Sequence, residues 1–124
     1  MDLSPTPSQI AEYADTLRRR SAHADERRRE RTDRAWAAAH EGARVLREHF
    51  GASAVFVFGS LVEGEHFTEH SDIDLAATGL TPATHLEALG RLLGLSREFE
   101  FDLVDLERCP ESVARAVAAG GEPL

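Results

Sequence analysis

The sequence predicts an α/β domain in which helices and short strands alternate, preceded by a helical N-terminal arm. Apolar residues recur at helical spacing in the first 50 residues and again after Thr81. A short apolar run at 52–59 and two alternating runs at 72–77 and 99–106 have the pattern of strands. With 124 residues, the chain is long enough for one core and too short for two.

A helix is expected to begin near residue 7. Thr6-Pro7-Ser8-Gln9 matches a capping box, with Thr6 as N-cap, Pro7 at N1 and Gln9 at N3. Apolar residues then follow at helical spacing in two sets, which are Ile10, Tyr13, Ala14 and Leu17, and Trp36, Ala39, Ala43, Leu46 and Phe50. The second set ends against Gly51, and we interpret it as core. The segment between the sets offers only alanines, which predicts a solvated helix or a linker.

The charge is uneven along the chain. Residues 17–34 hold eight arginines and four acids, whereas the whole chain has a net charge of −8. We interpret the basic stretch as a solvated helix face, and docking of an acidic or RNA-bound partner protein is the alternative. The overall acidity argues against direct nucleic-acid binding, because a dedicated binder of nucleic acid needs basic side chains facing phosphates.

The central part of the chain predicts strands. Residues 52–59 (ASAVFVFG) form a β-branched and aromatic run typical of a central strand buried on both faces. The alternation at 72–77 (DIDLAA) places Ile73 and Leu75 on one face and Asp72 and Asp74 on the other.

The C-terminal part predicts two more helices and one strand. Thr81-Pro82 opens a helix expected to bury Leu86, Leu89 and Leu93 before Gly94. In the strand at 99–106, alternation separates Asp102 and Val104 from the side that holds Phe99, Phe101, Leu103 and Asp105. A short last helix is expected at 110–119, with Cys109 as its N-cap.

Composition excludes several classes of protein. No apolar run approaches the roughly 18 residues that cross a bilayer, and the N-terminus lacks the pattern of a secretory signal. Cys109 is the only cysteine, so neither an intramolecular disulfide nor a cysteine zinc cluster can form. We therefore expect a cytoplasmic protein without a membrane partner.

Three features in order outline a phosphate site. Gly59-Ser60 stands at a strand end, Asp72-Ile73-Asp74 follows eleven residues later, and Asp102 lies inside a later strand. Residues i and i+2 of a strand point the same way about 6 to 7 Å apart, so Asp72 and Asp74 can both reach a pair of divalent ions. If the strand of Asp102 pairs beside that of Asp72, a third carboxylate joins this face and can act as a base toward a hydroxyl. Gly59 lets the backbone approach a phosphate, and Ser60 can donate to its oxygens.

Residues 58–77 (FGSLVEGEHFTEHSDIDLAA), followed by FDLVDL at 101–106, resemble the minimal nucleotidyltransferase (MNT) domain of the polymerase-beta-like superfamily. The signature of that superfamily is an apolar residue, Gly, Gly or Ser, about nine to thirteen residues, and then Asp, apolar, Asp or Glu, apolar. Phe58-Gly59-Ser60 and Asp72-Ile73-Asp74-Leu75 satisfy every position. Many relatives carry Arg or Lys just after Gly-Ser, whereas this chain has Leu61 and Glu63.

The resemblance implies a small mixed β-sheet flanked by helices at 45–124, with residues 1–44 as an Arg-rich arm outside it. It implies two Mg²⁺ ions and nucleotidyl transfer from a nucleoside triphosphate, ATP. By matching position, Asp72, Asp74 and Asp102 are the catalytic metal ligands, and Gly59 and Ser60 bind the nucleotide.

Minimal members of this kind are often antitoxins that attach AMP to a HEPN-domain toxin, so a homo-oligomer or a hetero-complex with such a toxin is expected. A binding module that neutralises its partner by contact alone is the alternative of another class. Transfer to a small molecule is less favoured, because the chain has no room for a separate acceptor domain.

His66-Phe67-Thr68-Glu69-His70 also spells the H-x-x-E-H zinc-peptidase motif. That motif needs a helix to align its histidines. Gly64 precedes it and the strand of Asp72 follows at once, so we interpret the segment as a polar loop. We assign no role to the remaining histidines.

Overall fold

A computed structural model describes residues 2–124, and its first helix is much longer than either predicted half. Helix α1 spans Pro7–Phe50, and the chain divides into compact units that meet between Arg31 and Thr32. The predicted capping box is confirmed, because the Thr6 N–H donates to Gln9 Oε1 at 2.8 Å and the Gln9 N–H donates to Thr6 Oγ1 at 3.1 Å. The arginine-rich segment is helical, and ion pairs three or four residues apart support it weakly, such as that between Arg19 and Asp15.

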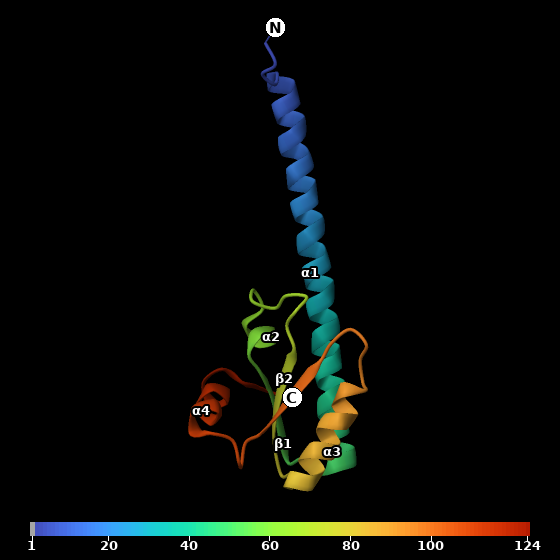
Figure 1. Cartoon of the computed structure of the whole chain (residues 1–124), viewed down its shortest axis with the longest axis vertical. Coiled ribbons are helices and arrows are strands. Elements are labelled where there is room, and N and C mark those ends of the chain that lie inside the picture. The colour runs from blue at the N-terminus through green and yellow to red at the C-terminus, as the bar shows by residue number, and fades with distance from the viewer. Residues whose placement is uncertain (1) are drawn as a thin grey trace. The chain divides into compact units, whose positions relative to one another are not determined.

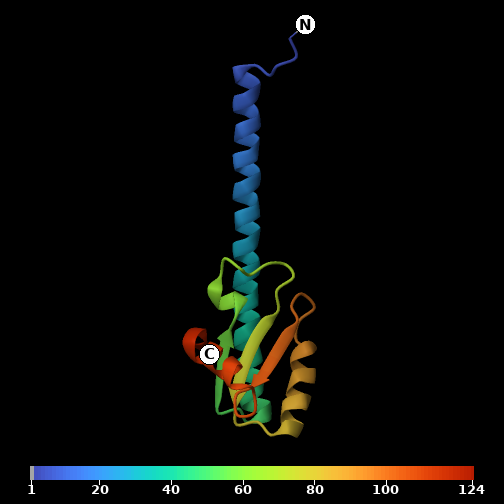
Figure 2. The ribbon, with the colours of Figure 1, turned by 60° about the vertical axis from the view of Figure 1, so that its left-hand side comes forward.

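The second unit contains one mixed four-stranded sheet, as expected. Its strands are β1 (Ala54–Phe58), β2 (Ile73–Thr78), β3 (Phe101–Asp105) and β4 (Glu122–Pro123), in the order β3-β2-β1-β4. Strand β1 runs antiparallel to both β2 and β4, and β2 runs parallel to β3 (Figure 2). The sequence did not indicate β4, because two residues are too few to show a period of two.

The main core lies between one face of this sheet and two helices. The part of α1 within the second unit covers that face together with α3, which spans Pro82–Leu93 (Figure 1). At their junction a Cβ on Gly42 would lie 3.1 Å from Leu75 Cδ1 and 3.2 Å from Phe101 Cε1, so the absent side chain lets α1 approach the sheet. The predicted core role of the second apolar set is confirmed, with Ala39, Ala43 and Leu46 buried and Trp36 and Phe50 packed at the margin.

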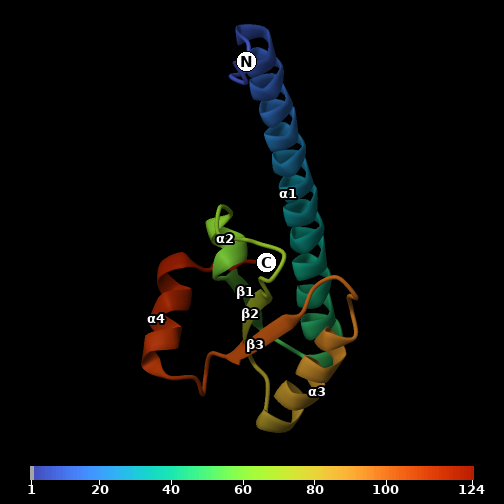
Figure 3. The same cartoon turned by 45° about the horizontal axis from the view of Figure 1, so that its top comes forward.

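The opposite face of the sheet carries helix α4, which spans Glu111–Gly120 (Figure 3). The prediction that β1 is buried on both faces is wrong in part, since Val55 and Val57 are buried but Phe56 and Phe58 are only half-buried. This face has the ten-residue helix α4 against β1 rather than a pair of long helices. The predicted N-cap of α4 is also wrong, because Pro110 occupies that position and the Cys109 thiol contacts the Leu106 carbonyl oxygen at 3.8 Å.

Helix α3 begins as predicted and buries a different face. Thr81 is its N-cap, and Thr84 completes a capping box with it. Ala88 and Leu92 are the buried residues, whereas Leu86 is 71 % and Leu93 is 51 % exposed. The expectation that the leucines mark the core face is therefore wrong for those two. Ala88 has a short side chain that allows close packing, and Leu92 lies one turn further along the same face.

None of the helices in residues 2–124 is both long and apolar enough to cross a membrane.

Candidate active site

The sheet brings two of the predicted acidic residues together. In the parallel pair of β2 and β3, Asp74 and Asp102 are register partners, so their side chains leave the same face of the sheet. Asp72 directly precedes β2 and stands two residues before Asp74, the spacing that returns a side chain to the same side of an extended chain. The neighbouring Ile73 and Leu75 point into the core. All three carboxylates thus belong to the face opposite α1 and α3.

Electrostatics at this face shows how closely the acids interact. The pKa of Asp74 is raised to about 6, first by its burial and then by the negative charges of Asp102 and Asp72. Like charges that cannot separate fully disfavour ionisation of the most buried member. A cation, or positive charge on a ligand, would relieve this repulsion.

Gly59 forms the turn beside Asp74. Its φ is +77°, a left-handed conformation that glycine adopts without strain. A Cβ on Gly59 would lie 2.5 Å from Asp74 Oδ2, closer than any real Cβ contact. Phe58, which precedes the turn, is the register partner of Asp74 across the β1–β2 pair. The absent side chain therefore leaves the space that the Asp74 carboxylate occupies.

Ser60 begins the short helix α2, which spans Ser60–Glu63. The first N–H groups of a helix have no acceptors within the helix, so the backbone at Ser60 can donate to a ligand. Leu61 is buried in the core and Glu63 is exposed. Leu61 thus contributes to packing and Glu63 carries a negative charge, at positions where many relatives have basic residues.

The loop before Asp72 is held by two residues that the sequence analysis missed. The Thr68 N–H donates to Ser71 Oγ at 2.9 Å, and the Ser71 N–H donates to the Thr68 carbonyl at 3.1 Å. Hydroxyl side chains that bind backbone groups two or three residues away are a known turn signal, which the spacing of Thr68 and Ser71 offered. These bonds fix the chain directly before Asp72.

The same loop lacks the helix that the zinc-peptidase motif at His66–His70 needs. Residues 64–72 form turns and bends rather than a helix, so His66 and His70 are not aligned on a helical face. Phe67 between them is buried against Phe99. The prediction of a polar loop is confirmed.

The donor chemistry of the three acids fits Mg²⁺, although the ligands are not gathered in advance. Between residues 2 and 124, no three His, Cys, Asp or Glu side chains already stand close enough together to hold a metal ion. Asp102 Oδ1 accepts the N–H of Leu103 at 3.0 Å, which turns one of its oxygens toward the backbone. Carboxylate oxygens are the ligands that Mg²⁺ prefers. A rotation about one side-chain bond of Asp102 would release this oxygen for a metal ion.

A mixed sheet with this acidic face beside a glycine turn has the architecture of the nucleotidyltransferase class. The family model described as Polymerase beta, Nucleotidyltransferase matches residues 42–124, so the chain belongs to that family. No curated protein matches it in sequence.

Solved structures agree with this assignment. A minimal nucleotidyltransferase is 27% identical with a TM-score of 0.61, over 75% of this chain and 95% of that chain. A mutant MntA-HpeT toxin–antitoxin complex is also 27% identical, with a TM-score of 0.58 over 68% of this chain and 69% of that chain. The tri-AMPylated Shewanella oneidensis HEPN toxin in complex with MNT antitoxin matches at 22% identity and a TM-score of 0.56, over 72% of this chain and 70% of that chain. The last likeness is one of fold alone.

Proposed function

We propose that this protein is a Mg²⁺-dependent nucleotidyltransferase that moves AMP from ATP to a hydroxyl group of a HEPN-type toxin. The observation that carries the proposal is the register of Asp74 and Asp102, which sets two carboxylates side by side next to the Gly59 turn. Membership of the nucleotidyltransferase family supports the reaction class.

Asp72, Asp74 and Asp102 are the residues that would hold Mg²⁺. The bound ions would neutralise charge on the phosphates and on the three acids. Asp74 is the most dependent on this neutralisation, because its pKa is raised to about 6 by burial and by the other two carboxylates. Gly59 and Ser60 would hold the triphosphate through backbone N–H groups and the Ser60 hydroxyl.

In the proposed reaction, the acceptor hydroxyl oxygen forms a bond to the α-phosphorus of ATP. The bond between that phosphorus and the oxygen bridging to the β-phosphate breaks, and pyrophosphate leaves with the electron pair. Asp102 accepts the hydroxyl proton, a role that fits its exposed position at the edge strand of the sheet. Positioning and charge neutralisation, rather than covalent catalysis, account for the rate.

Similar structures support a toxin as the acceptor. They include toxin–antitoxin complexes, one of which contains an AMPylated HEPN toxin and another AMP-PNP. Such an antitoxin would act in the cytoplasm, in complex with its toxin.

A second function is favoured by the residues after the glycine turn. Leu61 is uncharged and buried, and Glu63 is negatively charged and exposed. Neither residue therefore provides a positive charge to the triphosphate. A module that keeps the fold and silences its partner by contact alone would need no such charge.

Purified protein mixed with α-labelled ATP, Mg²⁺ and a HEPN-type toxin separates these functions. If the protein is an enzyme, label appears on the toxin. Asp72→Ala and Asp74→Ala then abolish this label while toxin binding persists. Asp105→Asn is the control on the other face of β3, and circular dichroism verifies its fold because Asp105 also pairs with Arg108. Silencing that survives both alanine substitutions, with no label transferred by the wild type, would establish the contact mechanism instead.

A further inference from the structure

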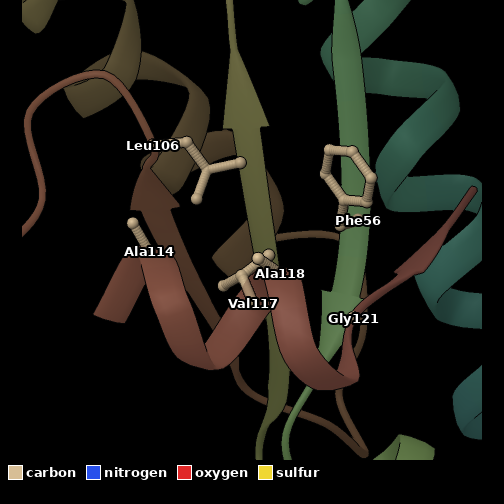
Figure 4. A pocket seen from close by; sticks show the side chains of 6 residues that line it. All are labelled: Phe56, Leu106, Ala114, Val117, Ala118 and Gly121. Carbon is tan, nitrogen blue, oxygen red and sulfur yellow. The ribbon is translucent and has the colours of Figure 1, made fainter. Parts of the chain in front are cut away.

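An apolar pocket opens on the face of the sheet that carries the carboxylates. It has a volume of about 320 Å³ and is lined by Phe56, Leu106, Ala114, Val117, Ala118 and Gly121. Figure 4 shows these residues around one space, with α4 on one side and the Phe56 ring of β1 on another. Its volume lies at the lower end of the range for pockets that bind small molecules, about 300 to 1,000 Å³. The proposed roles of the acids do not use this pocket.

The strand register places the pocket relative to the acids. Phe56 pairs with Ala76, and Phe58 pairs with Asp74, so Phe56 lies on the face of Asp74 and one strand repeat away. One repeat of two residues is about 6 to 7 Å along a strand. Leu106 stands four residues beyond Asp102 and also lines the pocket. The pocket thus begins one repeat from the carboxylates and extends away from them.

We propose that this pocket binds the base of the nucleoside triphosphate, an inference that rests on the proposed function. A ribose separates a base from its α-phosphate, so a base in the pocket leaves that phosphate within reach of Asp74 and Asp102. The aromatic ring of Phe56 offers a face for stacking, which every base can use. The small side chains of Ala114 and Ala118 leave a gap for a flat ring.

An aromatic side chain of the acceptor protein is less well suited to the same place. The hydroxyl of a tyrosine is bonded directly to its ring, without a spacer comparable to ribose. A tyrosine ring deep among Phe56, Leu106 and Val117 would place its hydroxyl against an apolar lining. The lining side chains carry no nitrogen or oxygen that could bind that hydroxyl.

Filling the pocket tests the proposal. Ala118 is exposed at the pocket, so Ala118→Leu adds bulk there without entering the core. Ala119→Leu is the matched control, because Ala119 is an exposed neighbour on α4 that does not line the pocket. Both keep good helix formers in α4. Ala114→Leu is a second filling variant, and circular dichroism verifies the fold of each protein.

The measurement is calorimetric affinity for AMP-PNP and for inorganic tripolyphosphate, each with Mg²⁺. We expect Ala118→Leu and Ala114→Leu to weaken AMP-PNP binding by about tenfold or more and to leave tripolyphosphate binding unchanged. Ala119→Leu should bind both ligands as the wild type does.

Equal AMP-PNP affinity in Ala118→Leu and Ala119→Leu would overturn the base pocket. Parallel weakening of AMP-PNP and tripolyphosphate would also overturn it, as would unchanged AMP-PNP binding with loss of label transfer, which would assign the pocket to the acceptor. Failure of the wild type to bind either ligand would instead contradict the proposed function itself.

Discussion

Asp74 and Asp102 face each other across the parallel pair of β2 and β3, and the pKa of Asp74 is raised to about 6 by burial and by the charges of Asp102 and Asp72. This juxtaposition means that the unliganded protein holds ionised carboxylates at the expense of its own stability. The carboxylates that the proposed reaction needs therefore lower the stability of the unliganded protein.

Replacing Asp74 by Asn should stabilise the metal-free protein at neutral pH. In the wild type the pKa of Asp74 lies above the ordinary aspartate value of 3.8, so between about pH 4 and 6 the folded state binds more protons than the unfolded chain. The free energy of unfolding contributed by this group is thus fully present below that window and is lost as pH rises through about 6. We expect Asp74→Asn to gain about 1 kcal/mol at pH 7, after allowance for solvent screening, and little at pH 4.

Urea unfolding at both pH values, with a chelator present, measures this difference. Asp33→Asn, at an exposed position of helix α1, is the control for a generic loss of charge. A gain at pH 4 equal to that at pH 7 would show that Asp74 does not titrate in this window.

Gly59→Ala should disrupt the Asp74 carboxylate, and Gly51→Ala should not. Both glycines have positive φ, +77° and +73°, so both substitutions strain the backbone. Only at Gly59 would the new Cβ meet Asp74 Oδ2, whereas nothing lies within 4 Å of one on Gly51. We expect label transfer to fall at least about tenfold more in Gly59→Ala than in Gly51→Ala, in assays on folded protein. Equal activity in the two variants would disprove the steric role of Gly59.

Ser71→Ala should weaken Mg²⁺-dependent nucleotide binding, because the Ser71 hydroxyl holds the loop directly before Asp72. Ser96→Ala is the matched control, since its hydroxyl accepts the N–H groups of Glu98 and Phe99 in another loop. Each change should lower the free energy of unfolding by about 1 kcal/mol. Only Ser71→Ala should also lower nucleotide affinity in calorimetry, and a similar loss in Ser96→Ala would reduce Ser71 to a general structural role.

Leu92→Ala and Leu93→Ala test which face of α3 is buried. Leu92 is fully buried, so its truncation should lower the free energy of unfolding by about 2 to 5 kcal/mol. Leu93 is 51 % exposed, and its truncation should change stability by about 0.5 kcal/mol or less. Chemical denaturation of both variants gives the comparison, and equal losses would place Leu93 in the core as well.

The two faces of α3 also show how far sequence reasoning reaches. The start of the helix was predictable, because Thr81 and Pro82 carry a local signal that needs no tertiary contact. Its buried face was not, because Leu86 and Leu93 are more apolar than Ala88, and only the close approach of helix to sheet makes the small residue the better fit. Similarly, alternation predicted that Asp72 and Asp74 share a face. The pairing of β3 beside β2, which brings Asp102 to that face, depends on tertiary structure and could not be predicted from the strand patterns. The spacing of Thr68 and Ser71 offered a turn signal, but only the structure shows that their hydrogen bonds hold the chain before Asp72.

The most direct test of the shared acidic face is the Mg²⁺ dependence of AMP-PNP affinity in the wild type, Asp102→Asn and Asp105→Asn. Asp102 and Asp105 share strand β3, and alternation sends their side chains to opposite faces. We expect Mg²⁺ to strengthen AMP-PNP binding in the wild type and in Asp105→Asn, and we expect this gain to be largely lost in Asp102→Asn. Retention of the full Mg²⁺-dependent gain by Asp102→Asn would contradict the placement of Asp102 in the site.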